Sequence, residues 1–407
     1  MVQSVLGSMT LGYRPLWNRS RELAGVQLFV HDNPETTLDS LHLLRTLEEL
    51  WSAESPPLLL SVQSRALLSS LLEQAPAGAP WFEVPGAWAS NDAGLRARVL
   101  AAHRRGLKMV WRDDVRRQPP PDIARCFERR LQSLQTDDTL AALQSIASRR
   151  AGQNNARPSP VQPGQIYEGI ASRALADHCL DQQGAWALAG WPAEDVLHAY
   201  RYQALQPSHR VCTQLLLALD TEQPMERLEQ LVGEEPILAY RLLTFVNSAA
   251  LGLRTGIGSI RHALMMMGVN SLKTWLVEQL PHASTDADLQ PVRAALVLRA
   301  RLTENLMDAG IEEDLRREVY LCGLFSQLDL LLDEPLPTIL HRLPLSDRIH
   351  SATVLHTGPY AGSLQVATAL ESSQAGRVLQ IAAEHEMETE EVNRALLRML
   401  SNMRRPT

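Results

Sequence analysis

Short apolar runs alternate with longer amphipathic segments from the start of the chain to about residue 190. The apolar runs lie at residues 23–30, 57–62, 81–84 and 107–111. Short, continuously apolar runs are typical of strands that helices cover on both faces of a sheet. Segments with helical spacing separate them, at residues 37–52, 64–73 and 91–105. Repeated strand–helix units favour a mainly parallel sheet or barrel with right-handed crossovers. We therefore expect an α/β fold in this half.

Beyond Trp191-Pro192 the strand pattern ends, and helical periodicity continues almost to the end of the chain. Apolar residues recur at helix spacing in residues 238–246 and again in residues 257–267, which gives each segment one apolar stripe. Prolines stand near the expected helix starts, where a missing backbone N–H costs nothing. The three consecutive methionines at residues 265–267 fit either a core or an adaptable binding surface, and we expect core. The second half is predicted to be all-α.

Composition excludes several classes of protein. With 407 residues, of which 45% are hydrophobic and 21% charged, the chain is long enough for two or three globular domains. A formal net charge of −7 gives no general attraction to nucleic acid or to anionic lipid, so neither partner is expected. No apolar stretch approaches the roughly 18–20 residues that span a bilayer, and residues 1–30 lack the order of a signal peptide. We expect a cytoplasmic protein without membrane contact.

Familiar signatures of catalysis are missing from the sequence. The four cysteines lie far apart, without the paired spacing of a zinc or redox site, so we expect reduced and mostly buried thiols. The sequence has no nucleophile elbow, phosphate-binding loop or dinucleotide fingerprint. Asp113-Asp114 is an acidic pair behind a strand-like run, where parallel-sheet proteins often place ligands for metal or phosphate. The competing interpretation of this pair is a solvated turn.

The most specific motif lies in the helical half. The sequence EPILAYRLLTFVNSAA at residues 235–250 is followed by IGSIRHAL at 257–264 and by MG at 267–268. This series closely resembles the HDOD domain, a family related to the HD-type metal-dependent phosphohydrolases, and the likeness extends over about residues 195–400. Its signature positions here are Pro236, Asn247, Ser248, Ala249, Ser259, Ile260, Ala263 and Gly268. Asn247 and Ser248 stand near a helix end, where we expect them to satisfy freed backbone groups.

The HD-type enzymes hold metals through a His-Asp pair in a segment that usually begins Gly-Leu-Leu-His-Asp. The similar segment of this chain has Ser326 and Gln327 at the two ligand positions, and Arg299 stands in the upstream ligand region. A neutral hydroxyl and an amide do not replace an imidazole and a carboxylate around a divalent cation, and an arginine would repel one. The resemblance therefore implies a helical domain with no metal, no cofactor and no hydrolytic activity.

Residues 10–192 resemble the cyclic-di-GMP phosphodiesterase barrel of bacterial EAL–HDOD proteins, with eroded motifs. Gln27 stands in place of the glutamate of the Glu-Ala-Leu segment, and Gln63 in place of an asparagine ligand. Acidic positions of that family are matched by Glu83, Asp113, Asp114 and Glu168. Gly86 stands where another acid would be expected, and Ala171 and Ala189 replace other polar positions. Too few anionic ligands remain for the two-metal activation of water. The resemblance implies a TIM-related barrel, complete or incomplete, that has lost its catalytic metals.

These resemblances divide the chain near Pro192, into an EAL-like domain at residues 1–192 and an HDOD domain at residues 193–407. The stretch RRAGQNNARPSPVQPGQ at residues 149–165 has the composition of a loop or a linker. The division places this stretch inside the barrel domain, as a loop.

The expected function is that of a non-enzymatic bacterial signal-transduction protein that acts through protein–protein interaction. Its partners would be signalling proteins such as sensor kinases, chemotaxis proteins or cyclic-di-GMP enzymes, docked on grooves of the helical half. Two alternatives remain open. One is a cyclic-di-GMP phosphodiesterase that uses Glu83, Asp113, Asp114 and Glu168 with magnesium or manganese. The other is a sensor that binds cyclic-di-GMP without cleaving it.

Overall fold

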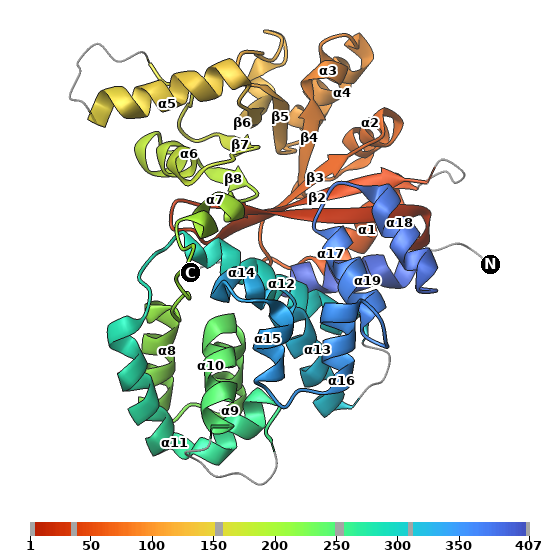
Figure 1. The fold of residues 1–407 in the computed structure, drawn as a ribbon. Helices are drawn as coiled ribbons and strands as arrows, with labels where there is room; N and C mark the ends of the chain where they lie inside the picture. Colours follow the sequence, from red (N-terminus) through yellow and green to blue (C-terminus); the bar gives the residue numbers. More distant parts are fainter. Residues whose placement is uncertain (1–4, 34–38, 151–157, 249–255, 308–311, 404–407) are drawn as a thin grey trace. The chain divides into compact units, whose positions relative to one another are not determined.

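The computed structural model describes residues 5–33, 39–150, 158–248, 256–307 and 312–403. The chain divides into two compact units (Figure 1). One unit joins Met1–Asp195 to Ala369–Thr407, and the other is Val196–Thr368. All four cysteines are buried free thiols, which confirms that prediction. Among the described helices, none has both the length and the apolar character that crossing a membrane requires.

Eight strands close the first unit into a barrel in which they follow one another in sequence order. β1 (Met9–Trp17) runs antiparallel to both of its neighbours, β2 (Leu23–Asp32) and β8 (Ala187–Ala189). Parallel pairs link the remaining strands, which are β3 (Leu58–Val62), β4 (Trp81–Pro85), β5 (Met109–Asp114), β6 (Phe127–Ser133) and β7 (Ile166–Glu168). The predicted α/β class is confirmed, and the barrel is complete.

Capped helices connect the strands of the barrel. They are α1 (Ser40–Leu50), α2 (Arg65–Gln74), α3 (Gly86–Ala89), α4 (Ala93–Arg104), α5 (Thr136–Arg150) and α6 (Arg173–Asp177). Four of them begin after a side chain that accepts a hydrogen bond from a first-turn N–H group, namely Asp39, Ser64, Asp92 and Ser172. Such caps satisfy donors that have no partner inside the helix and so mark where each helix begins.

The four predicted strands correspond to β2–β5, and the three predicted helices to α1, α2 and α4. The other four strands were not predicted. β1 contains Gly12, Arg14 and Pro15, and three of the seven residues of β6 are charged, so neither is a continuous apolar run. β7 and β8 have only three residues each. β5 continues to Asp114, three residues beyond its predicted end, and therefore includes Arg112.

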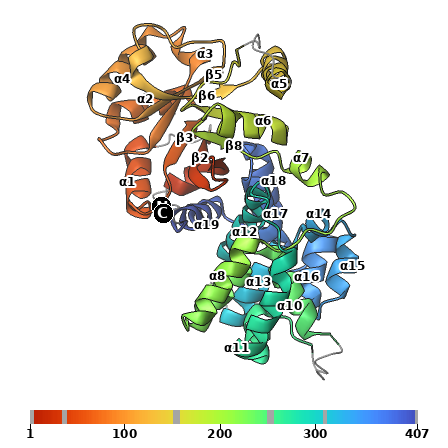
Figure 2. The same ribbon diagram turned by 90° about the vertical axis from the view of Figure 1, so that its left-hand side faces the viewer.

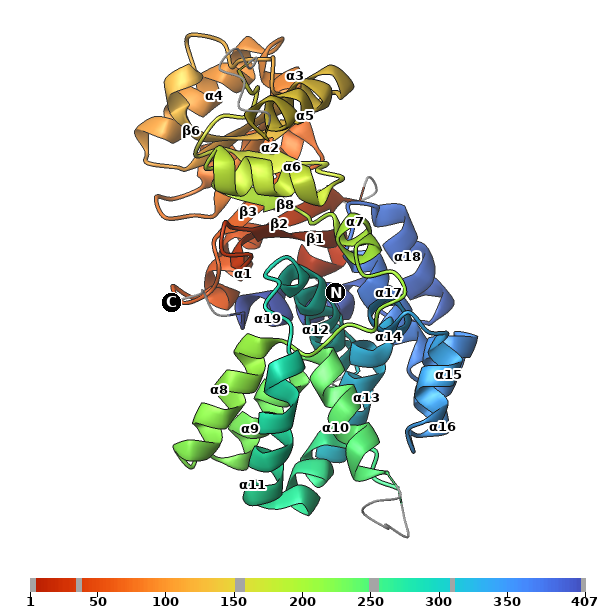
Figure 3. The same cartoon turned by 60° about the vertical axis from the view of Figure 1, so that its left-hand side comes forward.

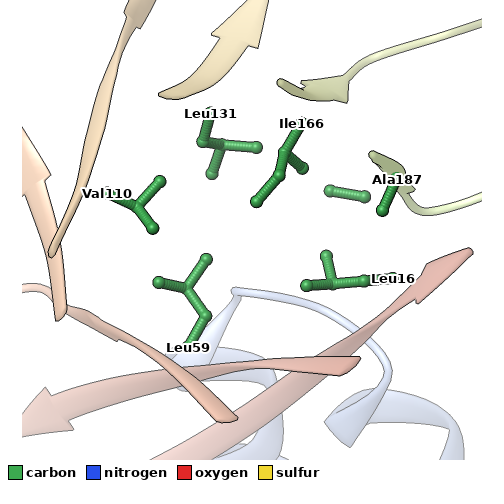
Figure 4. Close-up of a cluster of buried hydrophobic side chains, with 7 residues drawn as sticks. Leu16, Leu59, Val110, Leu131, Ile166 and Ala187 are labelled. Carbon is green, nitrogen blue, oxygen red and sulfur yellow. The ribbon is translucent and has the colours of Figure 1, made fainter. Parts of the chain in front are cut away.

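The middle of the barrel is filled by a layer of apolar side chains (Figure 4). Side chains of a strand point alternately into and out of a barrel. The buried members of this layer are Leu16, Leu59, Val110, Leu131, Ile166, Ala187 and Ala189, from six different strands. Trp81 and Trp186 are partly buried against them. The interior at this level is consequently a packed core and not a pore.

The last two helices of the chain belong to the barrel unit (Figures 1 and 2). α19 (Thr389–Ser401) contacts β1, and α18 (Ala375–Glu384) contacts both β1 and α19. The buried Asn393 side chain donates to the carbonyls of Leu6 at 2.7 Å and Met9 at 2.8 Å, and accepts from the Leu11 N–H at 3.1 Å. The compact helical unit thus ends at Thr368, although the predicted second domain continues to residue 407. The reason is that α19 buries its apolar face in the barrel unit.

The second unit is built of helices (Figure 3). Its principal helices are α8 (His209–Asp220), α9 (Met225–Gly233), α10 (Pro236–Val246), α11 (Ile260–Gln279), α12 (Leu289–Leu306), α13 (Glu313–Phe325), α14 (Leu328–Leu332), α15 (Leu336–His341) and α16 (Asp347–His350). Its described residues contain no strand, only one isolated bridge between Ser208 and Ser284. The all-α prediction is confirmed.

The methionine run of α11 is only partly buried. Met267 is buried, but Met265 and Met266 are more than half exposed, so the core prediction is wrong for these two. They lie on the solvent side of α11, whereas Ala263 and Leu264 face the interior. Gly268 has a φ of +66° and forms the kink between the two parts of α11. The stretch 149–165 connects α5 to β7, both in the barrel, and its residues 151–157 lie outside the described part of the chain.

Candidate functional site

A polar layer lies on top of the apolar layer inside the barrel. Because side chains alternate along a strand, the residue two positions after an inward apolar residue also points inward. Ser61 follows Leu59 in this way on β3, and Arg112 follows Val110 on β5. Six side chains at this level are joined by hydrogen bonds, namely Arg14, Gln27, Ser61, Glu83, Arg112 and Glu168. We call this set the mouth cluster.

Glu83 is the buried centre of one half of the mouth cluster, with 2% of its side chain exposed. The Gln27 side-chain amide donates from Nε2 to Ser61 Oγ at 2.8 Å and to Glu83 Oε2 at 3.0 Å. The Ser61 hydroxyl donates to the same carboxylate oxygen. A buried carboxylate needs such donors, because water no longer solvates its charge.

Arg112 bridges the two carboxylates of the mouth cluster. Its Nη1 lies 3.0 Å from Glu83 Oε1, and its Nε lies 3.1 Å from Glu168 Oε1. Arg14 adds a second guanidinium, with Nη1 at 3.0 Å from Glu168 Oε2. Burial opposes the charge of Arg112, but the two carboxylates outweigh this effect and raise its pKa above the ordinary arginine value. The two cations and two anions balance, so the cluster carries no net formal charge.

The mouth cluster does not fit the magnesium or manganese site that the phosphodiesterase alternative requires. Gln27 offers a neutral amide, and Glu83 and Glu168 already neutralise guanidinium groups. A divalent cation of the magnesium or manganese type prefers several anionic oxygen ligands and would face Arg112 directly. Among the residues that the structure describes, no group of three or more histidine, cysteine, aspartate or glutamate side chains is arranged to hold a metal.

Asp113 and Asp114 lie at the end of β5 and bond to the turn that follows. Asp114 accepts hydrogen bonds from the N–H groups of Arg116 and Arg117, both at 3.0 Å. The Arg117 side chain lies 3.2 Å from Asp114 and 3.7 Å from Asp113. Gly86 leaves space for the Asp113 carboxylate, and any larger residue there would collide with it. The acidic pair is therefore tied to Arg117.

Three further positions predicted from the barrel resemblance lie outside the mouth cluster. Gln63 is exposed and donates to its own strand, at the Ser61 carbonyl. Ala171 is exposed, and Ala189 belongs to the apolar layer. Conversely, the sequence analysis did not identify Arg14, Ser61 or Arg112 as site residues. The two-residue spacing from inward apolar positions was the signal that could have identified them.

The positions that replace the HD ligands lie at helix ends in the helical unit. Ser326 follows α13 as its C-cap and donates from its hydroxyl to the Gly323 carbonyl at 2.8 Å. Gln327 is the N-cap of α14, and Arg299 is buried within α12. Gly323 has no room for a larger side chain because Ala300 of α12 lies against it. Ser326 and Gln327 thus serve as helix caps, and Gly323 allows the close contact between α12 and α13.

Two of the HDOD signature positions, Asn247 and Ser259, bond to helix ends, whereas the Ser248 hydroxyl is buried without a hydrogen-bond partner among the described residues, so the expectation for Ser248 is wrong. Asn247 donates to the carbonyls of Leu243 at 2.7 Å and Ile257 at 2.8 Å, and accepts from the Ile257 N–H at 2.8 Å, as expected for a residue that satisfies a helix end. Ser259 caps α11 through the His262 N–H. Pro236 occupies the first turn of α10, Ile260 and Ala263 are buried, and Ser248 follows the helix end. Ala249 lies outside the described residues.

An ion pair is sealed inside the same unit. Glu235, the N-cap of α10, is fully buried and lies 2.8 Å from Arg293 Nε. It also accepts a hydrogen bond from the Leu238 N–H. Burial raises the pKa of Glu235 above its ordinary value, against the opposing effect of Arg293. Arg293 in turn donates to the Gln206 carbonyl at 2.7 Å, so both partners are held in place by backbone groups.

Comparison with known proteins bears most directly on the helical unit. Residues 205–333 match the family model of the HDOD domain. The chain is 30% identical over 144 residues to the protein YuxH of Bacillus subtilis and 27% identical over 149 residues to the cyclic di-GMP phosphodiesterase CdgJ of Vibrio cholerae. These alignments cover 34% and 36% of this chain, and 35% and 34% of the relatives. The matched part thus spans about a third of the length of each relative.

Similar solved structures include the MmoQ response regulator of Methylococcus capsulatus and the YkuI protein of Bacillus subtilis, which has an EAL domain. MmoQ is 18% identical, with a TM-score of 0.39, and the match covers 47% of this chain and 98% of that one. YkuI is 12% identical, with a TM-score of 0.29, and the match covers 47% of this chain and 57% of that one. From the family match, the HDOD resemblance is confirmed: residues 205–333 of this chain form an HDOD domain.

Proposed function

We propose that the chain is a non-enzymatic component of bacterial cyclic-di-GMP signalling. In this proposal an EAL-related barrel without catalytic metals supports an HDOD domain that binds other signalling proteins. The proposal is supported by the HDOD match and by the relative named as a cyclic di-GMP phosphodiesterase. The candidate partners are sensor kinases, chemotaxis proteins and cyclic-di-GMP enzymes.

The observation that carries the proposal is the position of Arg112 between Glu83 and Glu168. Metal-assisted hydrolysis needs carboxylates that are free to bind the cation and to hold an activated water molecule. Here a guanidinium takes up that binding capacity, and charge-assisted hydrogen bonds of this kind are among the stronger ones in proteins. Gln27, in place of a carboxylate, contributes a donor to the cluster and not an anionic ligand.

The test is a turnover assay on the full chain with cyclic-di-GMP and either Mn²⁺ or Mg²⁺, with the linear dinucleotide product separated by chromatography. We expect no product above the amount formed by a Glu83→Ala variant prepared in parallel, which reports contaminating activity. An active phosphodiesterase serves as the positive control. Turnover by the wild-type chain that disappears in Glu83→Ala would overturn the proposal and favour the phosphodiesterase alternative.

One observation favours the sensor alternative. The side chains of Arg14 and Arg112 are both about one third exposed, and guanidinium groups are good partners for phosphate. Calorimetry with cyclic-di-GMP separates the two ideas. The adaptor proposal predicts no saturable heat at high micromolar nucleotide. Saturable heat that is lost in an Arg14→Ala variant would establish the sensor.

A further inference from the structure

Two adjoining hollows lie on the surface of the helical unit, with volumes of about 290 and 460 Å³. Arg261 of α11 lines both of them, so the two hollows share a wall and together make one recessed surface along α9, α11 and α13. We call it the acidic groove and define it by the residues Glu226, Glu229, Arg261, Met265, Asp314 and Arg317. None of these residues belongs to the mouth cluster, and all lie in the unit Val196–Thr368.

In the acidic groove one carboxylate and two guanidinium groups lie inside, and two further carboxylates lie at the rim. Glu229 is largely buried and pairs with both Arg261 at 3.2 Å and Arg317 at 3.0 Å. Outside them, Glu226 pairs with Arg261 at 2.9 Å, and Asp314 with Arg317 at 2.9 Å. The Asp314 side chain is 95% exposed, and that of Glu226 is also mostly exposed. A molecule that approaches the groove therefore meets carboxylates first.

The count of charges agrees with this arrangement. Six carboxylates and three guanidinium groups line the two hollows, which gives the groove a net negative charge. Glu229, Glu226 and Asp314 together carry three negative charges against the two positive charges of Arg261 and Arg317. Because a carboxylate has about four lone-pair sites, the exposed Glu226 and Asp314 can each accept a further cationic donor. Charge complementarity of this kind mainly steers and orients a partner.

Apolar contact area is available beside these carboxylates. Met265 lines the groove and is 55% exposed, and Met266 next to it is about equally exposed. Methionine side chains are flexible and polarisable, and they are common on surfaces that adapt to several partner shapes. The two side chains that the core prediction placed inside thus provide an apolar strip at the edge of an acidic groove.

We propose that the acidic groove binds a basic amphipathic segment of a partner protein. Lysine or arginine side chains of the segment would pair with Glu226 and Asp314, while its apolar side chains would pack against Met265 and Met266. Helix-in-groove recognition combines the same two elements, apolar anchors and complementary charge. The inference rests on the proposed function, because docking is how a chain without turnover would act in signalling.

The test uses the full chain and two fluorescent synthetic peptides, an amphipathic helix of lysine and leucine and its counterpart of glutamate and leucine. Fluorescence anisotropy should show binding of the lysine peptide only, and added salt should weaken it by screening the rim charges. Asp314→Arg should weaken binding by about tenfold, because the peptide would then meet a like charge. Met265→Ser with Met266→Ser should weaken it several-fold.

Matched controls come from α5 of the barrel unit. Asp137→Arg reverses a similarly exposed aspartate, and Leu140→Ser removes a similarly exposed apolar side chain. Both should leave peptide affinity unchanged. The exposed ion pair between Asp314 and Arg317 contributes little to stability. Asp314→Arg should therefore have the same melting temperature as the wild type, which checks that the variant is folded.

The proposal is overturned if the lysine peptide does not bind, if the glutamate peptide binds equally well, or if Asp314→Arg has no larger effect than Asp137→Arg. These outcomes are distinguishable from failure of the proposed function. Cyclic-di-GMP turnover would contradict the non-enzymatic role, whatever the peptide measurements show. Absence of peptide binding, together with absence of turnover, would overturn only the proposal for the acidic groove.

Discussion

Each unit of the chain buries a glutamate against an arginine, but the two clusters differ in how far they are sealed. In the helical unit only 3% of the Arg293 side chain is exposed, and its partner Glu235 caps a helix. In the barrel, 34% of the Arg112 side chain is exposed beside an equally buried Glu83. The first cluster serves the fold alone. The second is partly open to solvent, and both of its carboxylates are paired with guanidinium groups.

Removal of Arg293 should lower the free energy of unfolding more than any other substitution in the two clusters. Arg293→Ala leaves the buried Glu235 charge without its ion-pair partner, and breaking such a buried pair typically costs about 3–5 kcal/mol. Urea unfolding followed by circular dichroism measures the loss. Arg394→Ala is the control, since its pair with Glu390 is exposed and should contribute less than about 0.5 kcal/mol. If the two variants were equally stable, the sealed cluster would not be a stabilising element.

Asn393 supplies a neutral buried group for comparison with the charged clusters. Asn393→Ala leaves two carbonyls and one N–H near the N-terminus without their partner, and we expect a loss of about 2–3 kcal/mol. Thermal melting measures it, with Gln380→Ala on the exposed face of α18 as the control. A melting temperature unchanged by Asn393→Ala would argue that residues 369–407 do not stabilise the barrel unit.

Arg112 should matter less for stability than Arg293. Arg112→Met leaves Glu83 with its bonds to Gln27 and Ser61, and the open side of the cluster admits water. We expect a loss of about 1–2 kcal/mol in the free energy of unfolding, measured in urea at neutral pH. A loss as large as that of Arg293→Ala would contradict the view that the mouth cluster is the more open of the two.

Much of the architecture could be predicted from the sequence, for identifiable reasons. β2–β5 are apolar runs with polar ends, and the helical half has caps and stripes that need no tertiary information. Arg112 was missed because β5 was expected to end at residue 111, which left this residue in a turn. With β5 extended to Asp114, the same residue points into the barrel, where it reaches Glu83 and Glu168.

The division of the chain could not be predicted from periodicity. The apolar stripe of α19 has the same spacing whether it packs on other helices or on the barrel unit, and the contacts that place it on the barrel, such as those of Asn393, join residues far apart in the sequence. Exposure of Met265 and Met266 was also beyond prediction, since a methionine run has the composition of a core. In both cases the sequence does not tell which surface, if any, packs against that side of the helix.

The most direct test of the central claim is calorimetric titration of the full chain with Mn²⁺. If Arg112 occupies the place of the catalytic cations, the wild-type chain should release no saturable heat that depends on Glu83. The wild type and Glu83→Ala should therefore give the same titration. Stoichiometric Mn²⁺ binding by the wild type that is absent from Glu83→Ala would contradict the account, because the mouth cluster would then still be a metal site.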